Sequence, residues 1–254
     1  MQIMKTKFSI KQDQLTFSKQ VVNHFYLGVI ITVFYAAISP QVVEAGYPSI
    51  TVLLLAELLV LTPIGLSHLY RKGKLLNGRY SLYNVIAFRE KLPVKSLIGW
   101  SLLGVLGCLV VYAPAYPLGL YLRETLFSWL PEWYFNPGFG TSDTQLIARV
   151  LLVGIFIDGL VGPIIEELFF RGYLLPRMSY LKKWAPIVNG VFFGLYHFWQ
   201  PHNLIGLMAV GIVLSYIVWK KKNVYLGIII HCSINIIGAI SAYLAASNGI
   251  IIGR

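Results

Sequence analysis

The sequence predicts an all-α fold, a polytopic bundle of about seven transmembrane helices that forms one integral membrane domain over residues 1–254. Composition is the first observation behind this prediction. Hydrophobic residues make up 57% of the chain and charged residues 12%, whereas soluble domains are roughly a quarter charged. The mean hydropathy of +0.68 is the second. The third is the alternation of polar segments with apolar stretches near the length, about 20 residues, that crosses a hydrocarbon core.

Seven apolar stretches are predicted to be the membrane spans. They cover, approximately, Val21–Ile38, Ile50–Tyr70, Ser96–Leu122, Gln145–Leu175, Trp184–Trp199, Leu204–Trp219 and Val224–Ala246. The fifth and sixth are short, which suggests tilting or burial by neighbouring helices. Because a long polar leader precedes the first stretch and six more follow, we expect an uncleaved first helix rather than a signal peptide.

Positive charge alternates along the chain and predicts the orientation of the bundle. Of the 21 Lys and Arg residues, 18 lie in four segments, and the intervening segments carry mainly acids. The four segments are the leader (Lys5, Lys7, Lys11 and Lys19), Arg71–Lys95, Arg171–Lys183 and Lys220–Lys222. The positive-inside rule therefore predicts a cytoplasmic N-terminus and an external C-terminus. The net charge of +11 is spread between apolar spans, so it indicates a membrane surface rather than nucleic acid as the partner.

Residues 164–172 read IIEELFFRG and place three ionisable side chains in an otherwise apolar stretch. A charged residue at a helix centre costs about 2.5–3.5 kcal/mol on insertion scales, so it usually has a partner or a function. Arg171 lies four residues after Glu167 on the same helix face, so these two are predicted to pair. Glu166 points in another direction and is left free, which suits general acid–base catalysis. Pro163, just before the acids, should loosen the helix there.

Three other polar side chains lie within the following apolar stretches. His197 comes four residues after Phe193, whose ring can brace the imidazole, and His231 and Asn235 are also four residues apart. At 1.5 Å per residue from the predicted cytoplasmic helix ends, these groups and Glu166 lie about 12–20 Å deep. The sequence therefore predicts one polar site in the middle of the membrane, to which three different helices contribute. Glu57 and His68 lie in the second span without a partner that the sequence identifies.

The chemistry of this predicted site points to hydrolysis by activated water. The sequence contains no GxSxG motif, no credible serine or cysteine triad and no HExxH metal helix. Glu166, helped by His197, could take a proton from water, and His231 and Asn235 could donate hydrogen bonds to the oxyanion that forms. Zinc held by Glu166 and the two histidines is the alternative. Since Asn235 fits an oxyanion role better than a zinc site, we expect no cofactor.

Three short motifs resemble those of a known family. EELFFR matches EExxxR, FGLYH matches FxxxH and HCSIN matches HxxxN, and the motifs occur in the family's order. They are the signatures of the CAAX-protease and bacteriocin-processing family, also called the Abi family, of intramembrane glutamate proteases. All three lie within residues 145–246, and the first three spans match the family only in general hydropathy.

The resemblance implies roles for individual residues. The first glutamate of the first motif and the histidine of the second activate water in the family, which implies these roles for Glu166 and His197. The third motif implies an oxyanion hole formed by His231 and Asn235. From their spacing, the supporting residues are expected to be Glu167, Arg171 and Phe193.

The predicted function is therefore that of an intramembrane endopeptidase that cleaves a membrane-associated peptide or protein. Two alternatives remain open at this point: a non-catalytic bacteriocin-immunity or regulatory scaffold, and a proton-coupled transporter that uses Glu166, Glu167 and Asp158. We expect a multi-pass protein of the cell membrane, in a bacterial cytoplasmic membrane. The sequence determines neither the substrate, prenylated or not, nor the oligomeric state.

Overall fold

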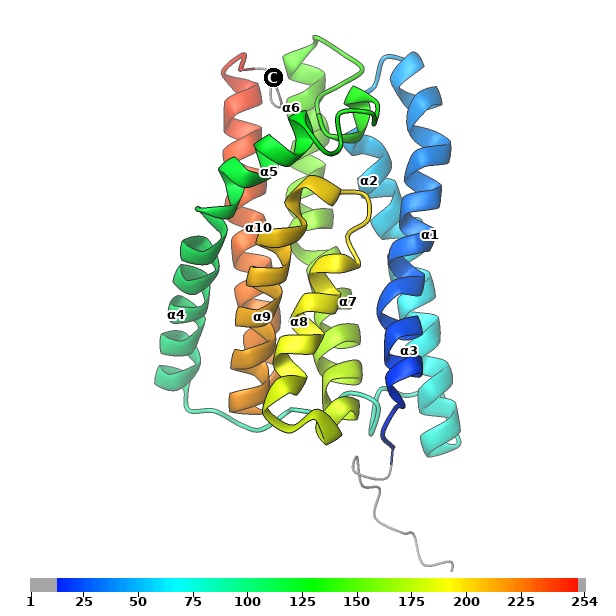
Figure 1. Ribbon diagram of the computed structural model, residues 1–254, viewed down its shortest axis with the longest axis vertical. Helices are drawn as coiled ribbons and strands as arrows, with labels where there is room; N and C mark the ends of the chain where they lie inside the picture. The colour runs from blue at the N-terminus through cyan, green and yellow to red at the C-terminus, as the bar shows by residue number, and fades with distance from the viewer. Residues whose placement is uncertain (1–12, 251–254) are drawn as a thin grey trace, which may run out of the picture.

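The computed structural model describes residues 13–250, which form a bundle of helices that run mostly side by side (Figure 1). No β-strand occurs in this range, where a bridge between Arg89 and Asn223 is isolated. The helices are α1 (Phe17–Glu44), α2 (Ile50–Ala56), η2 (Glu57–Leu61), α3 (Thr62–Asn77), α4 (Val94–Tyr112), α5 (Ala115–Glu124), η3 (Glu132–Tyr134), α6 (Thr144–Phe156), η4 (Ile157–Val161), α7 (Gly162–Glu166), η5 (Glu167–Leu174), η6 (Leu175–Trp184), α8 (Ala185–Leu195), η7 (Pro201–Asn203), α9 (Leu204–Lys221) and α10 (Val224–Ser247).

Six helical stretches among the described residues are long and apolar enough to cross a membrane, which confirms the all-α, polytopic membrane fold. Two predicted spans, Gln145–Leu175 and Trp184–Trp199, fall inside one of these stretches, Thr144–Leu195. The backbone there leaves helical geometry at Met178 and Lys182, and α8 runs back against the preceding helices (Figure 1). α8 has 11 residues, fewer than the about 20 of a crossing helix, so the return from the basic end to the start of α9 also includes the segment after Leu195.

Two predicted spans differ from the structure in their continuity. The stretch Ser96–Leu122 is not one helix, because α4 ends at Tyr112 and α5 begins at Ala115, after Pro114. Proline restricts the residue before it and removes a backbone donor, so the chain bends and α5 crosses the bundle obliquely (Figure 1). The predicted span Trp184–Trp199 ends early, at Leu195, so His197 lies just beyond α8 rather than within it.

The basic segments of the described chain gather at one end of the bundle. This end, at the bottom of Figure 1, is where α1 begins, α3 ends, α4 begins and α9 turns into α10. Lys19, Lys182–Lys183 and Lys220–Lys222 lie there, together with the connection from α3 to α4. The leader residues Lys5, Lys7 and Lys11 lie outside the described residues. The structure thus has the charge asymmetry that the predicted orientation requires.

The helices α8 and α9 pack closely, and their contact depends on glycine. A Cβ atom at Gly190 would collide with the backbone of α9 at Ile212, and one at Gly211 would collide with the Gly190 carbonyl. Small residues at such contacts let membrane helices approach closely enough for dispersion and polar contacts to hold them. This packing fixes the position of α8, which ends at the polar centre described below.

Candidate active site

The helix that carries the two acids is wound irregularly on both sides of them. The π-helical turns η4 and η5 flank α7, the five-residue α-helical segment that ends at Glu166. Pro163 has no backbone N–H to donate, which fits the wider winding of η4 just before it. Such π turns rotate the following side chains relative to a regular helix, and here they direct the acids into the interior of the bundle.

Glu167 and Arg171 form a fully buried ion pair. Arg171 Nη1 donates to Glu167 Oε1 at 2.8 Å, and neither side chain is exposed. The guanidinium also donates to Ser215 Oγ at 3.2 Å and to the Gly211 carbonyl at 3.3 Å, and it lies 3.9 Å from the centre of the Phe193 ring. Arg171 thus joins η5 to α9 through charge-assisted hydrogen bonds, and it contacts the end of α8 through the Phe193 ring.

Glu166 has different surroundings from its neighbour. Its Oε1 accepts a hydrogen bond from the Tyr196 hydroxyl at 2.7 Å and lies 3.9 Å from His197 Nε2. Its Oε2 lies 3.8 Å from His231 Nε2. The structure therefore brings Glu166 and the two histidines, from three separate parts of the chain, around one point. Both distances to the imidazoles exceed that of a direct hydrogen bond.

The His197 ring is held in one tautomer. Its Nδ1 lies 2.8 Å from the Phe193 carbonyl oxygen, which can only accept, so Nδ1 carries the proton. The Phe193 ring packs edge-on against the imidazole, with centroids 4.8 Å apart. In the neutral ring Nε2 is then an acceptor, and it is this atom that faces Glu166.

His231 contacts both acids. Its Nδ1 lies 3.1 Å from Glu167 Oε1, the same oxygen that Arg171 binds, while its Nε2 faces Glu166. With Nδ1 donating to the carboxylate, Nε2 carries a proton only when the ring is an imidazolium. The close approach of the carboxylate to α10 needs a glycine, since a Cβ atom at Gly227 would collide with Glu167 Oε2.

Asn235 lies one turn further along α10 and is engaged with another acid. Its side-chain nitrogen donates to the Asp158 carbonyl oxygen at 3.0 Å and, less closely, to Asp158 Oδ1 at 3.4 Å. The sequence analysis did not identify this contact. Asn235 and Asp158 share a cavity wall with Glu166 and the two histidines.

A polar chain connects the ion pair to α1. His24 Nδ1 donates to the Gln20 carbonyl at 2.7 Å, so its Nε2 can accept from the Asn189 amide nitrogen, 2.9 Å away. Asn189 Oδ1 in turn accepts from Ser215 Oγ at 2.8 Å, and Ser215 accepts from Arg171. Every member of this chain is buried. Hydropathy alone gave no signal for it, because four separate helices contribute one polar residue each.

A cavity of about 510 Å³ opens beside these groups. Its polar wall includes Glu57, Asp158, Glu166, His197 and His231. Apolar side chains of α4, α9 and α10 also line it: Cys108, Leu109, Leu207, Val210, Ile234 and Ile237. A cavity with both polar and apolar lining, inside a membrane domain, has the character of a site for a ligand that carries apolar groups and a few polar ones.

Glu57 is the acid whose surroundings the sequence did not reveal. It begins η2 and lies against Gly162, where a Cβ atom would be 2.7 Å from Glu57 Oε2. Glu57, Asp158 and Glu166 also line a smaller adjoining hollow of about 160 Å³. Three acids from three helical segments therefore meet at the cavity. Tyr196 was also missed, although it directly precedes His197 in the FGLYH motif.

No group of three or more His, Cys, Asp or Glu side chains within residues 13–250 has an arrangement that could hold a metal ion.

Part of the chain is similar to a known family. The model of the type II CAAX prenyl endopeptidase Rce1-like family matches residues 148–237, a range that holds all the polar groups around Glu166 except Glu57. The resemblance to the CAAX-protease family is confirmed. The matched range begins within α6 and ends within α10, so the first three predicted spans lie outside it.

Two curated relatives are similar to part of this chain. The UPF0177 protein YxdF of Lactococcus lactis subsp. lactis is 24% identical over 158 residues, which cover 51% of this chain and 88% of the relative. The "Putative membrane peptidase YdiL" of Bacillus subtilis is 29% identical over 112 residues, 41% of this chain and 45% of the relative. No solved structure matches. The family match, YdiL and the six membrane-length stretches together support a multi-pass membrane protease.

Proposed function

We propose that this protein is an intramembrane endopeptidase that hydrolyses a membrane-associated peptide or protein with water activated by Glu166 and His197. The observation that carries the proposal is the position of Glu166 between two imidazoles, at 3.9 and 3.8 Å, in a cavity inside the membrane domain. One water molecule can hydrogen-bond to both groups across such a separation, although the groups cannot bond to each other directly.

In the proposed reaction Glu166 takes a proton from this water while His197 Nε2 accepts a hydrogen bond and orients it. The hydroxide adds to the carbonyl carbon of the peptide bond, and the carbonyl oxygen becomes an oxyanion. Glu166 then passes its proton to the departing amine as the carbon–nitrogen bond breaks. A carboxyl that first accepts and then returns a proton suffices for both steps, so no other acid is required.

The oxyanion would lie at His231 and Asn235. His231 would donate through Nε2 when both ring nitrogens carry a proton, with Nδ1 held by Glu167 Oε1 at 3.1 Å. Asn235 would donate by exchanging its longer hydrogen bond, 3.4 Å to Asp158 Oδ1, while it keeps the bond to the Asp158 carbonyl. Glu167, Arg171 and Phe193 hold these groups in place and do not touch the substrate.

The proposed substrate class follows from the cavity, which has both polar and apolar lining. A prenylated substrate, as named for the Rce1-like family, is not required by these contacts. Because both curated relatives come from bacteria, we propose that the protein acts in a bacterial cytoplasmic membrane. Bacteriocin processing or immunity is one pathway in which such a peptidase could act.

The decisive experiment compares membrane peptides, by mass spectrometry, from cells with the wild-type protein, Glu166→Gln or Glu44→Gln at matched protein levels. Glu44 is exposed at the end of α1, so its variant controls for the loss of one carboxylate. We expect a peptide that appears with the wild type and Glu44→Gln and is absent with Glu166→Gln, since removal of the base should cost at least about 10²-fold in rate. Repeating the comparison with a chelator tests whether zinc takes part.

Identical peptide profiles for all three proteins, together with an unchanged cellular phenotype, would contradict the proposal. That result would favour a non-catalytic scaffold. Uptake into proteoliposomes that depends on a pH gradient and on Glu166 would instead favour a transporter.

A further inference from the structure

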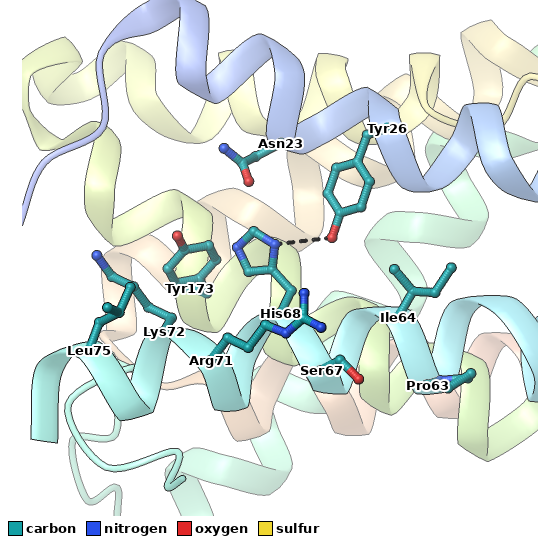
Figure 2. A pocket seen from close by; sticks show the side chains of 10 residues that line it. All are labelled: Asn23, Tyr26, Pro63, Ile64, Ser67, His68, Arg71, Lys72, Leu75 and Tyr173. Carbon is teal, nitrogen blue, oxygen red and sulfur yellow. Dashed lines mark hydrogen bonds between the residues drawn. The ribbon is translucent and has the colours of Figure 1, made fainter. Parts of the chain in front are cut away.

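A second hollow lies away from the acids, in a groove between α1 and α3. Figure 2 shows it, with α1 on one side, α3 on the other and Tyr173 of η5 behind. Its volume is about 640 Å³, and no residue that lines it also lines the cavity beside Glu166. The proposed protease activity gives this groove no role.

The groove is polar at one end and apolar at the other. Pro63 and Ile64 form its apolar end, and His68, whose Nδ1 lies 3.1 Å from the Tyr26 hydroxyl, lies at its middle. Arg71 and Lys72 follow on the next turn of α3, and in Figure 2 the Arg71 guanidinium reaches into the groove beside His68. A groove with a cationic end and an apolar end fits an amphiphilic ligand.

The cationic end carries more positive charge than the protein neutralises. Asp13 accepts from Lys72 Nζ at 2.6 Å and from Arg177 Nε at 2.7 Å, so two cations share one carboxylate. Arg71 is exposed and has no hydrogen bond or ion pair within residues 13–250. Three cations, Arg71, Lys72 and Arg177, are therefore balanced by one acid, Asp13. The planar guanidinium of Arg71 offers N–H donors that match the geometry of a phosphate.

The groove is placed where a lipid would reach it. It lies in the half of α3 that approaches the basic end of the bundle, the end predicted to be cytoplasmic (Figure 1). Leu75, on its rim, is 82% exposed, which means that this side of the groove faces away from the bundle. A soluble anion would gain nothing from the apolar end, whereas an acyl chain would.

We propose that this groove binds an anionic phospholipid of the adjacent leaflet, with its phosphate at Arg71 and Lys72 and its acyl chain against Ile64 and Pro63. Basic pockets between transmembrane helices on the cytoplasmic side are suited to such headgroups. The inference is independent of the proposed hydrolysis, because it rests on the charge, shape and position of the groove alone.

Bound lipid would stabilise the helix that carries the acids. The His68 ring packs against Phe169 and Tyr173 of η5, with centroids 5.2 and 5.3 Å apart. A ligand that orders His68 and Arg71 therefore also supports the turns that follow Glu167. A ligand that binds only the folded protein stabilises it by RT ln(1 + [L]/Kd), so the melting temperature rises with ligand concentration.

The test measures thermal unfolding of the purified full chain in neutral detergent with added phosphatidylglycerol or phosphatidylcholine. For the wild type we expect phosphatidylglycerol to raise the melting temperature by several degrees more than phosphatidylcholine does. Arg71→Gln should lose at least about half of this difference, and Arg71→Lys should keep part of it. Lys74→Gln is the matched control, because Lys74 is an exposed cation of the same helix that does not line the groove.

A third arm replaces the lipid with inorganic phosphate at the same phosphate concentration. We expect no comparable stabilisation, because the acyl chain is missing. The proposal is overturned if inorganic phosphate stabilises as much as the lipid does, if the two lipids act alike, or if Lys74→Gln loses as much as Arg71→Gln. Native mass spectrometry that detects phosphatidylglycerol on the wild type and on Lys74→Gln, but less on Arg71→Gln, would support it directly.

Discussion

At the scale of single residues, Arg171 holds the most partners around the acids. It is fully buried and bonds Glu167, Ser215 and the Gly211 carbonyl. We predict that Arg171→Ala destabilises the protein by about 3–5 kcal/mol, because it leaves the Glu167 carboxylate buried without its cation. Membrane accumulation and thermal unfolding measure this loss, and Arg149→Ala, an exposed arginine of α6, is the control.

The opposite result would reverse the assignment of the two acids. If Arg171→Ala accumulates normally and Glu166→Ala fails to fold, then Glu166 is the structural acid. The spacing of four residues made the Glu167–Arg171 contact predictable, since it lies within one helix. Tyr196, Glu57 and His24 were not predictable in the same way. Their contacts depend on how separate helices rotate about their axes, which hydropathy does not determine.

At the scale of helices, the packing of α8 on α9 positions both His197 and Arg171. The two helices touch through Gly190 and Gly211, and Gly211 is also an acceptor for Arg171. We predict that Gly190→Ala destabilises the protein by about 1–3 kcal/mol, because the added methyl group would force the two backbones apart. Thermal unfolding of the purified variants measures the effect.

The control for this prediction is Gly99→Ala in α4, where a Cβ atom would meet nothing within 4 Å. Alanine is the better helix former, so Gly99→Ala should leave the stability unchanged or raise it by up to about 1 kcal/mol. Equal effects at the two positions would mean that helix propensity, and not the close contact, determines the stability of α8.

The sequence located the helices approximately, but it did not predict where each helix ends. The apolar stretches located the helices because backbone groups in lipid must bond internally. The break at Pro114 and the early end of α8 at Leu195 were missed, since a run of apolar residues looks the same whether the helix continues or bends. The consequence for the site is specific: His197 lies on the turn after α8, and its Nδ1 bonds back to the Phe193 carbonyl.

At the scale of the whole molecule, composition determines the class of fold and charge predicts its orientation. The arrangement of α1, α2 and α3 around the motifs of the second half was not predictable, because these helices lie outside the family match. They nevertheless contribute Glu57 to the cavity and His24 to the polar chain. The first part of the chain therefore completes the site rather than only anchoring it.

The charge asymmetry predicts which end of the bundle faces the cytoplasm, and introduced cysteines can test it. Ser128, in the connection after α5, and Ser179, at the basic end, are both exposed, while the native Cys108 and Cys232 are buried. An impermeant maleimide added to intact cells should label Ser128→Cys and leave Ser179→Cys unlabelled, and broken membranes should give labelling of both. The reverse pattern in intact cells would place the basic end outside. It would also move the Arg71 groove to the outer leaflet, where the attraction between its cations and the anionic lipids of the cytoplasmic leaflet would no longer apply.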